Sequence, residues 1–200
     1  MPENEKGVQY VVFHGQDRVA AGSRLDAALA AQRLAGEAGV LIFGPDGRGV
    51  DFDLSGGPEA LAARLAPPAE APRGRGRPKL GVTAREVTLL PRHWDWLASQ
   101  PGGASVALRK LVEAARRESE GPDRIRAARE AAYRFASAIG GNLPGFEEAM
   151  RALFAGDDAG FEARIQAWPA DIAAQLRIYA AEAFGPDQLD LATTSSSTAL

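Results

Sequence analysis

The chain of 200 residues contains no cysteine, which excludes a disulfide framework and any thiolate metal site and agrees with a reducing compartment. No apolar run approaches the roughly 20 residues that a transmembrane helix requires. The polar start at Met1–Lys6 is not followed by the apolar stretch of a secretory signal. We therefore expect a cytoplasmic protein that does not enter a membrane.

Signatures of catalysis are also scarce. His14 has no cysteine or second histidine near it in sequence. The glycine-rich run 44–49 joins two expected strands and lacks the Lys-Ser/Thr ending of a phosphate-binding loop. Asp51 and Asp53 alternate with apolar residues and fit the solvated face of a half-buried strand. We expect no enzymatic activity, no cofactor and no metal site.

Charge is unevenly distributed along the chain, although its sum of 23 Lys and Arg against 26 Asp and Glu is only −3. Residues 1–72 carry 6 basic and 10 acidic side chains, residues 73–117 carry 10 and 3, and residues 118–200 carry 7 and 13. A basic middle between acidic flanks is typical of a segment that contacts nucleic acid, and it predicts salt-dependent binding. Alternatively, the acidic flanks fold back on the basic middle.

The centre of the basic middle reads Arg-Gly-Arg-Gly-Arg-Pro-Lys from residue 73 to residue 79. Narrow A·T-rich minor grooves attract arginine, glycine lets the backbone approach the groove floor, and proline keeps the strip extended. The strip resembles the AT-hook in four residues: Arg75, Gly76, Arg77 and Pro78. The resemblance implies a preference for A·T-rich double-stranded DNA, with the flanking Arg73 and Lys79 on phosphates. The alternative is a plain linker that happens to carry arginines.

The residues before this strip predict a small α+β module. Apolar and β-branched runs predict strands near 8–13, 18–21, 40–43 and 50–54. Ser23, with Asp26 three residues later, predicts a capped helix, and Pro58 predicts the first position of another. The expected order is ββαββα.

The residues after the strip combine an expected strand with two expected helices. Arg85–Leu90 predicts a short strand. Pro91 begins a helix whose Trp94 is expected in the core, and the glycine turn at 101–103 ends it. Ser105 is the expected N-cap of the second helix.

Strand, helix, glycine turn and helix in this order resemble the ribbon-helix-helix family of bacterial repressors and antitoxins. In that family two chains pair their strands, and the ribbon enters the major groove. The resemblance implies a homodimer in which Arg85 contacts bases, Ser105 anchors a phosphate at a helix N-terminus, and Arg109 and Lys110 contact further phosphates.

The strand departs from that family in its alternation. Val87 and Leu89 share the groove-facing side with Arg85, and the polar Glu86 and Thr88 point inward. The alternative is therefore a helical hairpin that packs on the rest of the protein.

The remaining chain predicts helices. Apolar stripes at helical spacing begin after Pro122, and Asp157 or Asp158 is expected to cap one helix. The last residues lack such periodicity and are expected to be disordered. The fold class is α+β in five parts: an α+β module at 1–66, a proline- and arginine-rich linker at 67–82, the strand-helix-helix segment at 83–118, a helical bundle at 119–188 and a tail at 189–200.

Taken whole, the chain resembles an uncharacterised family of bacterial proteins, a domain of unknown function. The resemblance is carried by residues 73–82, by the stretch from Arg85 through Leu111, and by Asn142–Ala149. It implies no particular activity. The residues themselves favour a bacterial DNA-binding protein that acts as a transcriptional regulator. The alternative is a non-catalytic interaction module whose basic linker docks an acidic partner.

Overall fold

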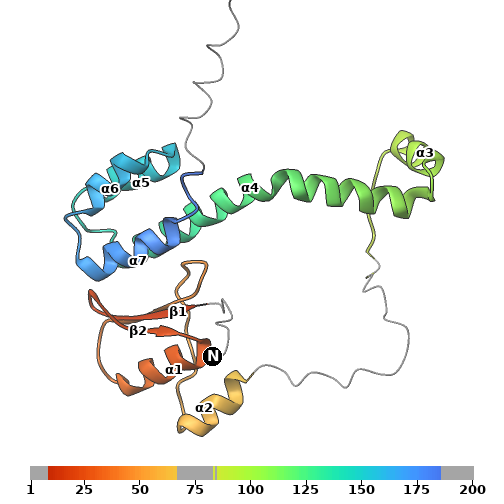
Figure 1. Ribbon diagram of the computed structural model, residues 1–200. Coiled ribbons are helices and arrows are strands. Elements are labelled where there is room, and N and C mark those ends of the chain that lie inside the picture. The colour runs from red at the N-terminus through yellow and green to blue at the C-terminus, as the bar shows by residue number, and fades with distance from the viewer. Residues whose placement is uncertain (1–8, 67–82, 84, 186–200) are drawn as a thin grey trace, which may run out of the picture. The chain divides into compact units, whose positions relative to one another are not determined.

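The computed structural model describes residues 9–66, 83 and 85–185 (Figure 1). They divide into two compact units, one from the described parts of 1–66 and 121–200 and one from those of 67–120. We call these the sheet unit and the hairpin unit. The elements are β1 (Tyr10–His14), β2 (Asp17–Gly22), α1 (Arg24–Arg33), β3 (Val40–Phe43), α2 (Pro58–Leu65), α3 (Pro91–Ser99), α4 (Gly103–Ile139), α5 (Phe146–Ala155), α6 (Asp158–Ile165) and α7 (Ala170–Ala180).

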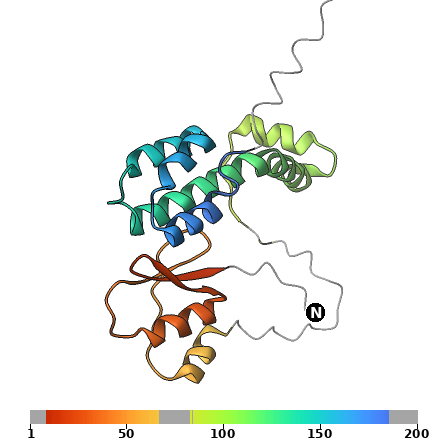
Figure 2. The ribbon, with the colours of Figure 1, turned by 60° about the vertical axis from the view of Figure 1, so that its left-hand side comes forward.

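The sheet unit is built on a three-stranded antiparallel sheet in the order β2-β1-β3. Side chains of β1 alternate between two cores. Val11 and Phe13 pack with residues of α4 to α7, whereas Val12 packs with α1 and α2. Figures 1 and 2 show α1 and α2 on one side of the strands and α7 on the other. The sheet is therefore covered on both faces, and the mixed α+β class is confirmed.

Local signals set the helix ends as expected. The Ser23 hydroxyl accepts from the backbone N–H of Asp26 at 3.2 Å, and the Asp26 carboxylate accepts from the backbone N–H of Ser23 at 3.0 Å. The Ser23 hydroxyl also donates to the Asp26 carboxylate at 2.7 Å, and this bond, followed by the bond from the Ser23 backbone N–H, lowers the pKa of Asp26. Pro58 occupies the first position of α2, and Asp157 caps α6 through the N–H of Gly160 at 2.9 Å. The predictions for the starts of these three helices are confirmed.

An aromatic cluster joins the sheet to the C-terminal helices. Phe135 of α4 lies 5.5 Å from Phe13 and 4.9 Å from Phe43, between ring centroids, and 5.2 Å from Tyr179 of α7. The Tyr179 hydroxyl donates to the carbonyl of Gly44 at 2.7 Å. These contacts connect parts of the chain that lie far apart in the sequence.

The loop 44–49 packs directly against α4. Gly47 has a φ of +72°, which L side chains rarely adopt, and a Cβ there would overlap the carbonyl oxygen of Ala131 and lie 2.7 Å from its carbon. Arg134 donates to the carbonyl of Asp46 at 3.3 Å. The loop therefore needs glycine at position 47 for both its backbone conformation and its contact.

Two expectations differ from the structure. The expected strand at 50–54 is not formed. Only the backbone N–H of Val50 donates to the carbonyl of Ile42, at 2.8 Å, and Gly49 forms an isolated β-bridge with Phe43. The side chain of Gln32 instead donates to the carbonyls of Leu54 and Gly56, which holds this segment toward α1. The prediction of a fourth strand was wrong.

The second difference is the length of α4. It continues through Pro122, so the second expected helix of the strand-helix-helix segment and the first helix of the expected bundle form one element. Proline in a helix interior removes one backbone hydrogen bond, and Gly121 before it is a weak helix former, so the local sequence favours a break that α4 does not have. Residues of α4 up to 120 belong to the hairpin unit, and those from Gly121 belong to the sheet unit. None of the helices in the described ranges is both long and apolar enough to cross a lipid bilayer.

Candidate nucleic-acid interface

The predicted DNA-binding residues fall into two groups. The first lies outside the described residues and comprises Arg73, Arg75, Gly76, Arg77, Pro78 and Lys79. The second lies in the hairpin unit and comprises Arg85, Ser105, Arg109 and Lys110. Only the second group has a described geometry.

A glycine turn determines where α4 begins. Gly102 and Gly103 have φ values of +86° and +73°, and the N–H of Gly103 donates to the carbonyl of Gln100 at 2.9 Å. The helix starts at Gly103, three residues earlier than an N-cap at Ser105 predicts. Ser105 lies in the first turn and is not the N-cap, so this prediction was wrong. Because two successive left-handed residues reverse the chain, the helix can start directly after the turn.

The first turns of α4 bring three of the predicted residues together. The Arg109 side chain donates to the carbonyl of Ser105 at 3.1 Å, and Lys110 is exposed beside it. No acidic residue stands in the first turn. The free N–H groups of a first turn carry partial positive charge, so this end of α4 is suited to an anion. Arg85 is also exposed, but no hydrogen bond or ion pair among the described residues joins it to the other three.

The segment before α3 is extended but not a strand. Among the described residues, none forms a backbone hydrogen bond with positions 85–89, and only the carbonyl of Leu90 accepts, from the first turn of α3. The ribbon of the ribbon-helix-helix family takes its second strand from another chain. The ribbon therefore stays a prediction.

The buried side chains of the hairpin unit differ from those predicted from the sequence. Trp94 was expected in the core but is 39% exposed, whereas Leu97 and Ala107 are buried at 2% and 7%. Leu97 lines one groove with Leu108 and Leu111 of α4, and Trp94 is not part of that lining. Arg92 on α3 is also exposed, but it was not among the residues predicted to bind DNA.

A narrow groove of about 270 Å³ runs between the two helices of the hairpin unit. It is lined by Leu89, His93, Trp96, Leu97, Leu108 and Leu111. The lining is apolar except for the imidazole of His93.

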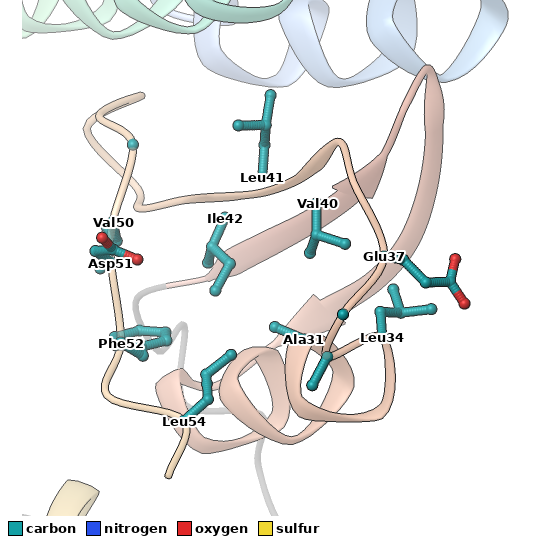
Figure 3. Close-up of a pocket in the computed structure, with 13 residues that line it drawn as sticks. Ala31, Leu34, Glu37, Val40, Leu41, Ile42, Val50, Asp51, Phe52 and Leu54 are labelled. Carbon is teal, nitrogen blue, oxygen red and sulfur yellow. The ribbon is translucent and has the colours of Figure 1, made fainter.

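The sheet unit holds a larger cavity of about 510 Å³ beside β3 (Figure 3). Val40, Ile42 and Phe52 contribute apolar walls. Glu37 and Asp51 lie on opposite sides of it in Figure 3, so they do not form a carboxylate pair. Glu37 also contacts the His14 imidazole at 3.2 Å. Within the described ranges no group of His, Asp and Glu side chains is arranged to hold a metal ion.

A second cavity of about 510 Å³ in the sheet unit lies between α4, α7 and residues 45–46. Tyr179 borders it. Burial, and then the nearby charge of Asp46, raises the pKa of its phenol far above the ordinary value of 10.0. Arg134 contacts the Glu130 carboxylate at 2.6 Å. The cavity thus presents a neutral phenol and a paired arginine.

Comparison with known proteins gives one match. Residues 9–180 match the model of a family described as "Uncharacterized protein conserved in bacteria (DUF2239)". The match covers described residues of both units. No curated protein and no solved structure matches the chain.

Proposed function

The chain belongs to this bacterial family, which carries no assigned activity, and we propose from its own residues that it binds double-stranded DNA, prefers A·T-rich sequences and acts as a transcriptional regulator. The observation that carries the proposal is the segregation of charge. Ten basic and three acidic residues lie in 73–117, between two acidic flanks. Phosphate neutralisation by such a segment releases counterions and supplies most of the affinity for DNA.

In this proposal the strip 73–79 binds in the minor groove. Arg75 and Arg77 enter the groove, and Arg73 and Lys79 contact phosphates on either side. Minor-groove contacts separate A·T from G·C but do not read a unique sequence. The strip therefore confers a preference for A·T-rich DNA, and any recognition of a particular base sequence comes from other residues of the chain.

The hairpin unit adds contacts through Arg85, Ser105, Arg109 and Lys110. Its described residues carry six Lys and Arg against five Asp and Glu, so the unit is nearly neutral as a whole. Its cations at the start of α4 contact nearby phosphates and position the protein on the DNA backbone. Most of the salt dependence of binding therefore comes from the strip.

The test is fluorescence anisotropy on matched A·T-rich and G·C-rich duplexes at two salt concentrations. The four cations of the strip and those at 85, 109 and 110 together bring about seven positive charges to the DNA, so log K should fall with log salt with a slope of about −6. The double variant Arg75→Ala/Arg77→Ala should lose affinity for A·T-rich duplex much more than for G·C-rich duplex, with a slope of about −4.5.

A matched control removes two exposed arginines from the sheet unit. Arg151→Ala/Arg164→Ala changes the net charge by the same amount and should leave both affinities close to wild type. An equal loss on both duplexes in the strip variant would reduce the strip to a general electrostatic contact. Wild-type protein that binds neither duplex would refute the proposal.

A second function is favoured by the acidity of the C-terminal part, where residues 118–200 carry 7 basic and 13 acidic side chains. Such a surface attracts the strip of the same or another chain. In this alternative the protein is a non-catalytic interaction module whose basic linker docks an acidic partner. It predicts negligible DNA binding and salt-sensitive capture of an acidic polypeptide such as polyglutamate by the full chain, which Arg75→Ala/Arg77→Ala weakens.

A further inference from the structure

The hairpin unit has too small a core to be complete in one chain. We propose that a second copy of this chain completes it, by covering the apolar groove between α3 and α4 and by pairing with the extended segment 85–90. This inference goes beyond DNA binding and holds whether or not DNA is bound. It rests on burial, exposed area, backbone hydrogen bonding and charge.

Burial gives the first argument. Among the described residues of the hairpin unit, only the side chains of Leu97 and Ala107 are buried. Folded pieces of about 40 residues or fewer seldom bury enough apolar surface to be stable without disulfides, metals or oligomerisation. The chain has no cysteine. Association is therefore the available way to enlarge this core.

The exposed apolar surface gives the second argument. Six large apolar side chains of the unit are between 39% and 61% exposed: Val87, Leu90, Trp94, Trp96, Leu111 and Val112. With roughly 150–250 Å² for a whole aromatic side chain and about half that for Val or Leu, these fractions amount to roughly 400 Å². A standard interface takes roughly 800 Å² from each partner, of which about 60% is apolar. The apolar surface of one copy is thus close to what a stable dimer needs.

Unused backbone groups give the third argument. In the described part of the chain no backbone group bonds to positions 85–89, although Val87 and Thr88 favour a strand. An extended segment with free N–H and C=O groups is a template for another strand. A second copy brings the same segment, and antiparallel pairing about a two-fold axis satisfies both copies at once.

Charge identifies the occupant as a second copy. The described residues of the unit carry six basic and five acidic side chains, so two copies meet without net repulsion. The groove itself has no Lys, Arg, Asp or Glu in its lining. A strongly acidic or basic partner would find no complementary charge in it, whereas a copy of the unit offers exposed apolar side chains that can cover it.

The first test measures the mass of the full chain by sedimentation velocity, without DNA, over a series of dilutions. Wild-type protein should form a dimer that dissociates on dilution. Leu111→Glu places a charge in the groove and should weaken dimerisation by about 100-fold or more. Far-UV circular dichroism establishes that the variant is folded.

Arg117→Gln is the matched control for that variant. It changes net charge by the same single unit and is exposed on α4, nine residues from Leu108 and so two and a half turns away on the opposite side of the helix. Its dimerisation should equal that of wild type. If Arg117→Gln also gave monomers, the effect would come from charge and the assignment of the groove would be overturned.

The second test uses the absence of cysteine in the natural chain. Val87→Cys should form disulfide-linked dimers under mild oxidation, because antiparallel pairing brings the two copies of this residue close. Ala163→Cys, exposed on α6 of the sheet unit, should cross-link far less. Equal cross-linking of the two variants would overturn pairing at this segment. Wild-type protein that stays monomeric up to roughly 100 µM would overturn the whole proposal, since standard interfaces bind more tightly.

Discussion

Replacing Gly47 by alanine probes the contact between the loop 44–49 and α4. Alanine in the left-handed region costs about 1–2 kcal/mol. The added Cβ would also overlap the carbonyl of Ala131, and overpacking of this kind typically costs about 1–3 kcal/mol. The sum is about 2–5 kcal/mol, a large share of the roughly 5–15 kcal/mol by which domains are stable. At about 2–4 °C per kcal/mol for a chain of this size, Tm should fall by about 4–20 °C.

Two other glycines separate the backbone cost from the cost of contact. Gly15 has a φ of +61°, and nothing lies within 4 Å of the place that a Cβ would take, so Gly15→Ala should lose only the backbone contribution of about 1–2 kcal/mol. Gly49 has neither a positive φ nor a close neighbour, so Gly49→Ala should be neutral or slightly stabilising. Thermal unfolding followed by circular dichroism ranks the three variants. A Tm for Gly47→Ala equal to that of Gly15→Ala would refute the contact with α4.

Two further changes test local hydrogen bonds by urea denaturation. Ser23→Ala removes half of the capping box and should cost about 0.5–2 kcal/mol at pH 7. The part of this cost that comes from the bond between the Ser23 hydroxyl and the Asp26 carboxylate requires an ionised carboxylate. Because the folded pKa of Asp26 lies below its ordinary value of 3.8, that part is complete above this value and should fade as pH drops through the folded pKa. A difference unchanged down to about pH 2 would contradict it. Tyr179→Phe removes one of the two donors to the buried carbonyl of Gly44, the other being the backbone N–H of Gly47, and should cost about 0.5–1.5 kcal/mol; a stability equal to wild type would show that the bond contributes nothing.

The features predicted correctly from the sequence are local ones. Ser23 and Asp157 were identified as caps because a short polar side chain satisfies N–H groups only two or three residues away. Pro58 marks a helix start for an equally local reason. The expected strand at 50–54 does not form, and the carbonyl of Leu54 at its end instead accepts from the side chain of Gln32, about twenty positions earlier. Contacts of that kind leave no signal in a short window of sequence.

The candidate interface shows the same limit. Arg109 and Lys110 were identified from charge, and their exposure on α4 needs nothing more than the helical pattern. The start of α4 was misplaced by three residues because φ at Gly102 and Gly103 depends on the turn as a whole. The packing of Phe13 against Phe135 joins parts of the sequence that had been expected to fold as separate modules.

The division of the sheet unit into two distant stretches also has a consequence during translation. Phe13 and Phe43 leave the ribosome long before Phe135, against which they pack. At about 5–20 residues per second, the roughly 120 residues between Phe13 and Phe135 take roughly 6–24 s to make. During that time one apolar face of the sheet stays exposed to water. The nascent chain is thus the form of this protein most exposed to aggregation and most in need of a chaperone.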